Sequence, residues 1–279
     1  MKNYAFMAGL PRSGSTLLSS ILSQNPEIYS GPNSPMCGMM FNLERSIYAS
    51  EQYAAYPKPE VMSKTVTGLL DGYYSDIDKP FVIDKSREWP LPEHFEMLKR
   101  NFQNKIKVIM PVRPIIEVLA SFIDLVHRNP SSISFIDREI EARQEFNFYR
   151  QTDEIRCDHL MRPKGLIDNC IYGMLYAMQP ENKDYFHFVN YGELIENPDE
   201  AMSGIYEFLE LEPFAHDFNS LENDTPEDDK TYGLRGMHDV RSKLSRRVIV
   251  PEEVLPPYSI QKYAGSDVFF SLQGHTDED

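Results

Sequence analysis

The chain has 279 residues, of which 28 are basic and 43 are acidic, so its formal net charge at pH 7 is −15. Its 41 % hydrophobic and 25 % charged residues exclude a disordered or collagen-like chain, and its length suits one large domain or two small ones. An acidic chain repels nucleic acid and anionic membranes unless its basic residues gather in one place. We therefore expect neither nucleic acid nor a membrane as a partner.

Short apolar runs and helical spacing of apolar residues alternate along the chain. The runs predict strands at 3–8, 80–84, 107–112 and 185–190. The spacing predicts helices at 15–23, 114–127, 134–149, 165–178 and 198–209. Alternating strands and helices predict a three-layer αβα fold, with a mainly parallel sheet and helices on both faces. We expect a single domain over 1–279.

The chain carries no sign of a membrane span or of export. Its longest apolar stretch, 105–126, is interrupted by Arg113, Pro114 and Glu117, and the N-terminus lacks the pattern of a secretory signal. The three cysteines have no Cys-x-x-Cys spacing, so we expect neither a disulfide framework nor a zinc site: Cys37, Cys157 and Cys170. The sequence therefore predicts a cytoplasmic protein.

The segment from Gly9 to Thr16 has the glycine frame of a P-loop and lies between a predicted strand and a predicted helix. In such a loop, backbone N–H groups and the positive end of the helix hold an anion. Nucleoside triphosphatases carry a lysine at the place of Ser15, and that lysine reaches the β- and γ-phosphates. Here the positive charge comes from Arg12 instead. The loop predicts an anion site, and the missing lysine disfavours a triphosphatase.

The string Pro11-Arg12-Ser13-Gly14-Ser15-Thr16 resembles the loop of sulfotransferases that use 3′-phosphoadenosine 5′-phosphosulfate (PAPS). The similar branch contains bacterial enzymes and protein-tyrosine sulfotransferases. The resemblance implies that the 5′-phosphosulfate is held by Arg12, Ser13, Gly14, Ser15 and Thr16.

A second motif of that family is Val-Arg followed by a helix with a serine eight residues after the arginine, and Val112, Arg113 and Ser121 match it. The resemblance implies that Arg113 and Ser121 bind the 3′-phosphate of the donor. Arg113 ends a predicted strand, and Ser121 lies about two helical turns further on the same face.

Two more segments are similar to the family. Phe81 to Lys85 resembles a strand that ends in a lysine, which implies that Lys85 stabilises charge on the bridging and sulfuryl oxygens. The segment from Val189 to Pro198 resembles one whose tyrosine, here Tyr191, lies beside the nucleotide. Asp84 leaves an alternative open, because P-loop hydrolases also end an apolar strand with a magnesium-binding acid.

The basic residues gather near the C-terminus. Arg235 to Arg247 carries five basic residues and one acid, directly after five acids within 222–229. A solvated face that balances those acids is one interpretation. The resemblance implies another, a loop at about 233–250 that covers the donor, with Ser242 at the reaction centre and the phosphates near Lys243, Arg246 and Arg247.

The general base is not where the resemblance places it. In the protein-tyrosine branch a glutamate follows the loop arginine by about twenty residues, and the matching position here is Asn33. An amide does not accept a proton as a carboxylate does. The candidate bases are Asp84, then Glu44 and Glu88, with His94 as a further option. Otherwise the acceptor is acidic enough to need little help, or activity is lost.

The resemblance implies in-line transfer of a sulfuryl group from PAPS to a hydroxyl or amine, with 3′,5′-bisphosphoadenosine (PAP) as product and without a metal. The residues leave two alternatives open, a magnesium-dependent P-loop nucleotide kinase or triphosphatase and a non-catalytic nucleotide-binding pseudoenzyme. The acceptor is expected to be a small molecule, a peptide or a glycan. We expect residues 45–78 and 128–165 to determine which acceptor is used. The sequence also leaves a homodimer open as an assembly.

Overall fold

A single parallel sheet forms the centre of the molecule in the computed structural model, which describes residues 2–102, 105–143 and 151–273. Within these residues the strand order is β2-β3-β1-β4-β5, and each neighbouring pair is parallel. The strands are β1 (Asn3–Met7), β2 (Ile28–Asn33), β3 (Phe81–Lys85), β4 (Val108–Val112) and β5 (Phe186–Asn190).

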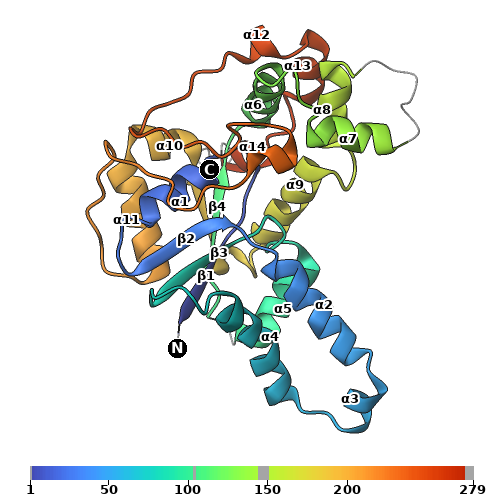
Figure 1. Ribbon diagram of the computed structural model, residues 1–279, viewed down its shortest axis with the longest axis vertical. Coiled ribbons are helices and arrows are strands. Elements are labelled where there is room, and N and C mark those ends of the chain that lie inside the picture. The colour runs from blue at the N-terminus through green and yellow to red at the C-terminus, as the bar shows by residue number, and fades with distance from the viewer. Residues whose placement is uncertain (1, 103–104, 144–150, 274–279) are drawn as a thin grey trace.

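Both faces of the sheet are covered by helices (Figure 1). Alternate residues of a strand point to opposite faces, and here they enter two separate cores. Ala5 and Met7 pack with α1 (Ser15–Leu22) and α11 (Pro198–Leu209). Phe6 packs on the other face, where the helices are α2 (Met36–Tyr48), α4 (Pro59–Tyr73), α5 (Pro92–Phe102), α6 (Ile115–His127) and α9 (Leu166–Ala177).

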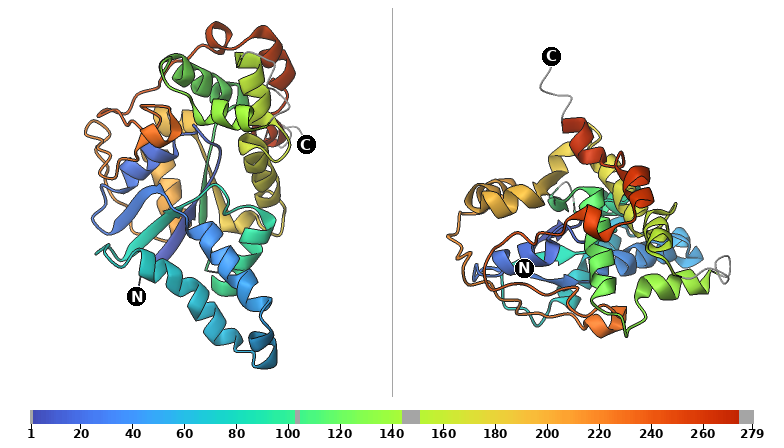
Figure 2. Two further views of the ribbon diagram at one scale, coloured as in Figure 1. Left: turned by 45° about the vertical axis from the view of Figure 1, so that its right-hand side comes forward. Right: turned by 90° about the horizontal axis from the view of Figure 1, so that it is seen from above.

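The shorter elements lie around this frame (Figure 2). With α2 and α4, α3 (Glu51–Ala55) forms an arm at one end of the molecule, and the helices α7 and α8 lie at the other end. These and the remaining elements are α7 (Phe135–Ala142), α8 (Asp153–Met161), η2 (Lys183–Tyr185), α10 (Tyr191–Glu196), η3 (Asp229–Tyr232), α12 (Pro251–Val254), α13 (Pro257–Tyr263) and α14 (Val268–Gln273). Among the described residues, no helix is long and apolar enough to cross a membrane.

The predicted fold is confirmed, and each of the four predicted strands is present within one residue of its predicted start. The predicted helices are also present, except that the one at 134–149 ends at Ala142 and its prediction for 144–149 lies outside the described residues. The strand β2 was not predicted, since Gly31 and Pro32 weaken the strand signal. It lies at the edge of the sheet, where a proline is tolerated, and its register shifts between Ser30 and Asn33.

Candidate functional site

The segments that follow three neighbouring strands meet at one edge of the sheet. The loop Ala8–Gly14 follows β1, Arg113 follows β4, and Tyr191 follows β5. Because the strands are parallel, their carboxyl ends lie at the same edge, where open α/β sheets bind ligands. The topology therefore brings together motifs that lie far apart in the sequence.

Glycines at both ends of the loop allow its close packing. Gly9 has φ of +95°, and a Cβ there would lie 2.3 Å from the carbonyl oxygen of Pro111. Gly14 has φ of +92°, and a Cβ there would lie 2.8 Å from Cδ2 of Tyr191. A side chain at either position would be strained and would collide. The backbone of the loop therefore packs directly against β4 at Gly9 and against Tyr191 at Gly14, where α1 begins.

Arg12 joins the loop to the other motifs. Its Nε donates to Oγ of Ser121 at 3.1 Å, and its Nη1 donates to the carbonyl of Met237. In turn, Nη1 of Arg113 donates to the carbonyl oxygen of Arg12 at 3.2 Å. The Arg113 guanidinium also lies over the ring of Tyr191, 4.5 Å from its centroid. Five residues from four segments therefore form one connected wall.

This wall lines one side of an open cavity of about 340 Å³ with a strongly positive lining. Asp239 is the one carboxylate in the lining, against seven cationic side chains, which are Arg12, Arg87, Arg113, Arg128, Arg241, Lys243 and Arg247. The pKa of Arg12 is lowered to about 10 by burial and by the neighbouring guanidinium groups of Arg247, Arg113, Arg128 and Arg87. Crowded cations that depress one another's pKa form a site for a multiply charged anion.

Most of the predicted anion-binding residues line this cavity. These are Arg12, Gly14, Ser15, Thr16, Arg113, Ser121, Tyr191, Lys243 and Arg247. Ser13 is buried and donates to the carbonyl of Leu10, which closes the loop internally. Arg246 lies outside the lining and pairs with Glu117 at 3.5 Å and Glu196 at 3.4 Å. Ser242 also lies outside it, and the Ser245 three residues later contributes to the wall.

Lys85 is buried at the carboxyl end of β3, with 3 % of its surface exposed. Its pKa is lowered to about 8, chiefly by burial, with a raising influence from Glu227 and a lowering one from Arg87. Arg87 lines the cavity, and Lys85 itself does not. The ammonium therefore lies outside the lining, and the charges of Glu227 and Arg87 act on it.

Asp84 lies in the core on the opposite face of β3. Its carboxylate accepts hydrogen bonds from Oγ of Ser34 at 2.5 Å, the hydroxyl of Tyr74 at 2.7 Å and Nε1 of Trp89 at 2.8 Å. Burial raises its pKa, and these three hydrogen bonds oppose the rise. The residue does not line the cavity, and its oxygens are used to join β3 to the neighbouring segments.

Glu44 is engaged in a similar way. It is 2 % exposed, and its carboxylate accepts from Nη2 of Arg100 at 2.5 Å and from Nδ2 of Asn101 at 2.8 Å. These contacts hold α2 against α5. Since both oxygens have partners in another helix, Glu44 serves the packing of these helices.

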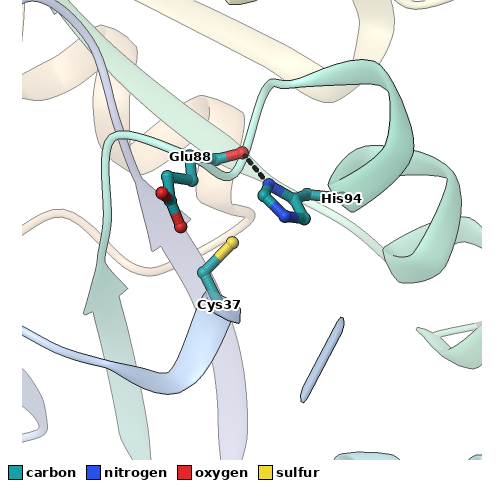
Figure 3. Close-up of side chains that lie close together, drawn as sticks. All are labelled: Cys37, Glu88 and His94. Carbon is teal, nitrogen blue, oxygen red and sulfur yellow. Dashed lines mark hydrogen bonds between the residues drawn. The ribbon is translucent and has the colours of Figure 1, made fainter. Parts of the chain in front are cut away.

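Glu88 and His94 lie beside Cys37 in a separate group (Figure 3), whose potential ligand atoms are all within 4.8 Å of one another. Nδ1 of His94 is 3.0 Å from the backbone carbonyl of Glu88. Burial raises the pKa of the Cys37 thiol well above its ordinary value, with Glu88 and Asp84 adding to the rise. All three cysteines lie among the described residues, and all are free and buried.

Three cations of the cavity were not predicted from the sequence. Arg87 follows Lys85 by two residues, and Arg128 follows Ser121 by seven, about two helical turns. Arg241 belongs to the basic cluster but was given no role of its own. Helical spacing from Ser121 would have identified Arg128, whereas the orientation of Arg87 depends on the turn after β3.

The sequence profile named "Sulfotransferase family" matches residues 5–216 of this chain. Three solved structures with similar folds are the sulfotransferase domain from the curacin biosynthetic pathway, the sulfotransferase domain of the Synechococcus PCC 7002 olefin synthase, and mouse sulfotransferase SULT7A1 complexed with PAP. Their identities are 16 %, 17 % and 15 %, with TM-scores of 0.51, 0.51 and 0.53. The matches cover 95 %, 95 % and 98 % of this chain, and 97 %, 96 % and 89 % of the others. No curated protein matches the sequence.

Proposed function

Because this chain belongs to the sulfotransferase family, we propose that it transfers a sulfuryl group from PAPS to a hydroxyl or amine acceptor. The observation that carries the proposal is the cavity with seven cationic side chains against one carboxylate, in a chain of net charge −15. PAPS carries several negative charges, and a cavity of this charge favours such a ligand over neutral ones.

The donor is assigned to the cavity by its two anionic ends. The 5′-phosphosulfate is assigned to the loop residues Arg12, Gly14, Ser15 and Thr16, because backbone N–H groups at the start of α1 complement an anion. The 3′-phosphate is assigned to Arg113 and Ser121, and the nucleoside to the side of Tyr191. The segment 233–250 supplies Lys243 and Arg247 to the cavity, which supports its role as a cover for the donor.

In the proposed reaction, the acceptor oxygen or nitrogen forms a bond to sulfur as the bond from sulfur to the bridging oxygen breaks. The bonding pair leaves with the phosphate of PAP, and the acceptor proton goes to a base. Charge develops on the bridging and sulfuryl oxygens, and fixed cations stabilise it. We assign this role to Arg12 from the loop and to Lys85 from β3, and the proposal requires no metal at this step.

The acceptor is proposed to be a small molecule, a peptide or a glycan, selected by segments outside the donor motifs. The arm α2–α4 includes most of 45–78 and exposes aromatic side chains such as Tyr48 and Tyr56, which are 53 % and 70 % exposed. Exposed aromatic rings suit contacts with acceptor rings or sugars. We also propose a cytoplasmic location, since free cysteines suit a reducing compartment.

Calorimetric titration with PAP in the presence of a chelator tests the donor assignment. We expect binding without magnesium, and affinity that falls with salt because it depends on charge. Selective binding of ATP with magnesium would overturn the assignment in favour of a kinase or triphosphatase. Transfer of labelled sulfate from PAPS over a panel of acceptors then tests catalysis, and tight PAP binding without any transfer would indicate a pseudoenzyme.

A further inference from the structure

Asn33, which stands where a glutamate is expected, lies next to Lys85 and bonds a different carboxylate. It pairs with Lys85 in the register of β2 and β3. Its Nδ2 donates to Oε1 of Glu227 at 3.2 Å. Glu227 comes from the acidic segment 222–229, nearly two hundred positions later in the chain. A carboxylate is thus brought to this place from another part of the sequence.

Glu227 is turned inward although it belongs to an exposed acidic run. Its side chain is 11 % exposed, and its Oε2 lies 3.3 Å from Nε2 of His238. After burial, Glu227 is the largest influence on the pKa of Lys85, which it raises. The carboxylate thus acts on the buried ammonium through its charge and lies beside the imidazole, and Asn33 fixes its other oxygen.

His238 is held in one orientation by Asp229. Its Nδ1 is 2.6 Å from Oδ1 of Asp229, and its backbone N–H donates to Oδ2 of the same carboxylate at 3.2 Å. In the neutral imidazole this contact assigns the proton to Nδ1 and leaves the lone pair on Nε2. The residue is 7 % exposed and lines the donor cavity. An imidazole at the cavity wall whose Nδ1 is fixed by a carboxylate is an arrangement suited to proton removal by Nε2.

We propose that His238 is the general base of the transfer, positioned by Asp229 and Glu227, with Asn33 holding Glu227. The proposal rests on the proposed sulfotransferase function. Nε2 takes the proton of the acceptor hydroxyl or amine as the acceptor bonds to sulfur, and the electron pair of the broken sulfur–oxygen bond leaves with PAP. The proton then stays on Nε2, and the charges of Glu227, 3.3 Å from Nε2, and of Asp229 stabilise the imidazolium. Asp229 accepts the Nδ1 hydrogen before and after the step.

Burial sets the direction in which the pKa of His238 shifts. Burial lowers this pKa, Glu227 and Asp229 oppose the fall, Lys85 adds to it, and the net direction is downward. The ring of Tyr232 packs against it with 5.7 Å between centroids. A lowered pKa keeps the imidazole neutral near pH 7, which is the form that accepts a proton.

The first experiment compares His238→Gln with the wild type and with His127→Gln, a surface histidine paired with Asp153. We expect His238→Gln to reduce kcat by about 10²–10⁴-fold, the usual contribution of a general base. The variant should still bind PAP, which also shows that it is folded. His127→Gln should behave as the wild type. Near-normal kcat in a His238→Gln variant that binds PAP would overturn the proposal.

The second experiment measures the pH profile of kcat/KM for Glu227→Gln and Asn33→Ala. Loss of the Glu227 charge removes an influence that raises the pKa of His238, so the acid limb should move to lower pH and kcat should fall. Asn33→Ala should move the limb in the same direction by less. An unmoved acid limb in Glu227→Gln, or loss of turnover in Glu227→Gln while His238→Gln stays active, would overturn the assignment of the base.

The two proposals fail in different ways. If the wild type neither binds PAP nor transfers sulfate from PAPS to any acceptor in the panel, the proposed function fails. If the wild type does both and His238→Gln is equally active, the function stands and the base assignment fails.

Discussion

The Arg113 guanidinium donates a hydrogen bond of 3.2 Å to the backbone carbonyl of Arg12, across 101 positions of sequence. The same guanidinium pairs with Glu117 at 3.0 Å and lies over Tyr191. One side chain thus connects the loop after β1, the start of α6 and the start of α10. The position of the loop Ala8–Gly14 depends on this connection as well as on its own glycines.

Arg113→Lys is expected to weaken PAP binding although it keeps the charge. An ammonium lacks the planar fork that reaches the Arg12 carbonyl and Glu117 together. Loss of one charge-assisted hydrogen bond costs about 1.5–3 kcal/mol, or roughly 10- to 150-fold in Kd. Calorimetry with PAP measures the change, and the exposed Arg45→Lys on α2 serves as the control. An unchanged Kd for Arg113→Lys would contradict the connecting role.

The adjacent residues Arg246 and Arg247 are expected to differ in how much they contribute to PAP affinity. Arg247 lines the cavity and pairs with Asp124 at 2.6 Å, whereas Arg246 pairs with Glu117 and Glu196 outside the lining. Arg247→Ala should raise the Kd for PAP by about tenfold or more and reduce its dependence on salt. Arg246→Ala should have a smaller effect, because exposed ion pairs contribute little. Equal effects of the two substitutions would refute this distinction.

PAP affinity is expected to fall as the pH rises through about 8, the lowered pKa of Lys85. Above that pH the ammonium loses its proton and no longer attracts the donor phosphate. Lys85→Arg should keep its charge over this range, so its affinity should stay level where that of the wild type declines. Titrations of both proteins between pH 7 and 9.5 check this. A parallel decline in the two would assign the effect to another group.

Lys85 also links stability to pH. Its pKa of about 8 in the folded protein lies below the ordinary value of 10.5, so the unfolded chain binds more protons between these values. The contribution of Lys85 to the free energy of unfolding should therefore increase with pH in that window. The difference in urea stability between the wild type and Lys85→Met, followed from pH 7 to 10.5, measures it. A constant difference would contradict the lowered pKa.

Asp84 is expected to contribute to stability and not to proton transfer. Asp84→Ala leaves the donors of Ser34, Tyr74 and Trp89 without their acceptor, at a cost of about 3 kcal/mol or more in the free energy of unfolding. Asp84→Asn keeps an acceptor for Trp89 and a donor for the hydroxyls, so it should stay folded and keep its turnover. Urea denaturation and the sulfate-transfer assay measure the two effects. Loss of turnover in a stable Asp84→Asn variant would restore Asp84 as a base.

Because the pKa of Asp84 is raised, the effect of Asp84→Asn on the free energy of unfolding should depend on pH. The folded protein holds the Asp84 proton more tightly than the unfolded chain, so stability decreases as the pH rises from the ordinary value of 3.8 through the raised pKa. Asp84→Asn has no such proton and should lack this decrease. The difference in stability between the two proteins should therefore shift in favour of the variant as the pH rises.

The sequence alone determined the parallel fold, the glycine-framed loop between β1 and α1 and most of the residues that form the cavity wall. These features depend on local signals: apolar runs, helical spacing, a glycine frame, and residues placed directly after strands. Because parallel strands end at one edge of the sheet, residues in that position meet there whatever separates them in the sequence. Arg12, Arg113 and Tyr191 could be predicted for this reason.

Only the tertiary structure decided which charged side chains line the cavity and which make contacts within the packed core. Asp84 and Lys85 are neighbours in β3, and the alternation of the strand sends their side chains to opposite faces. The contact of Glu227 with Asn33 depends on how an irregular acidic loop folds back, and loops without periodicity give no such signal. The charge of −15 therefore did not exclude an anionic ligand, because the fold gathers seven cations into one cavity and leaves most of the acids elsewhere.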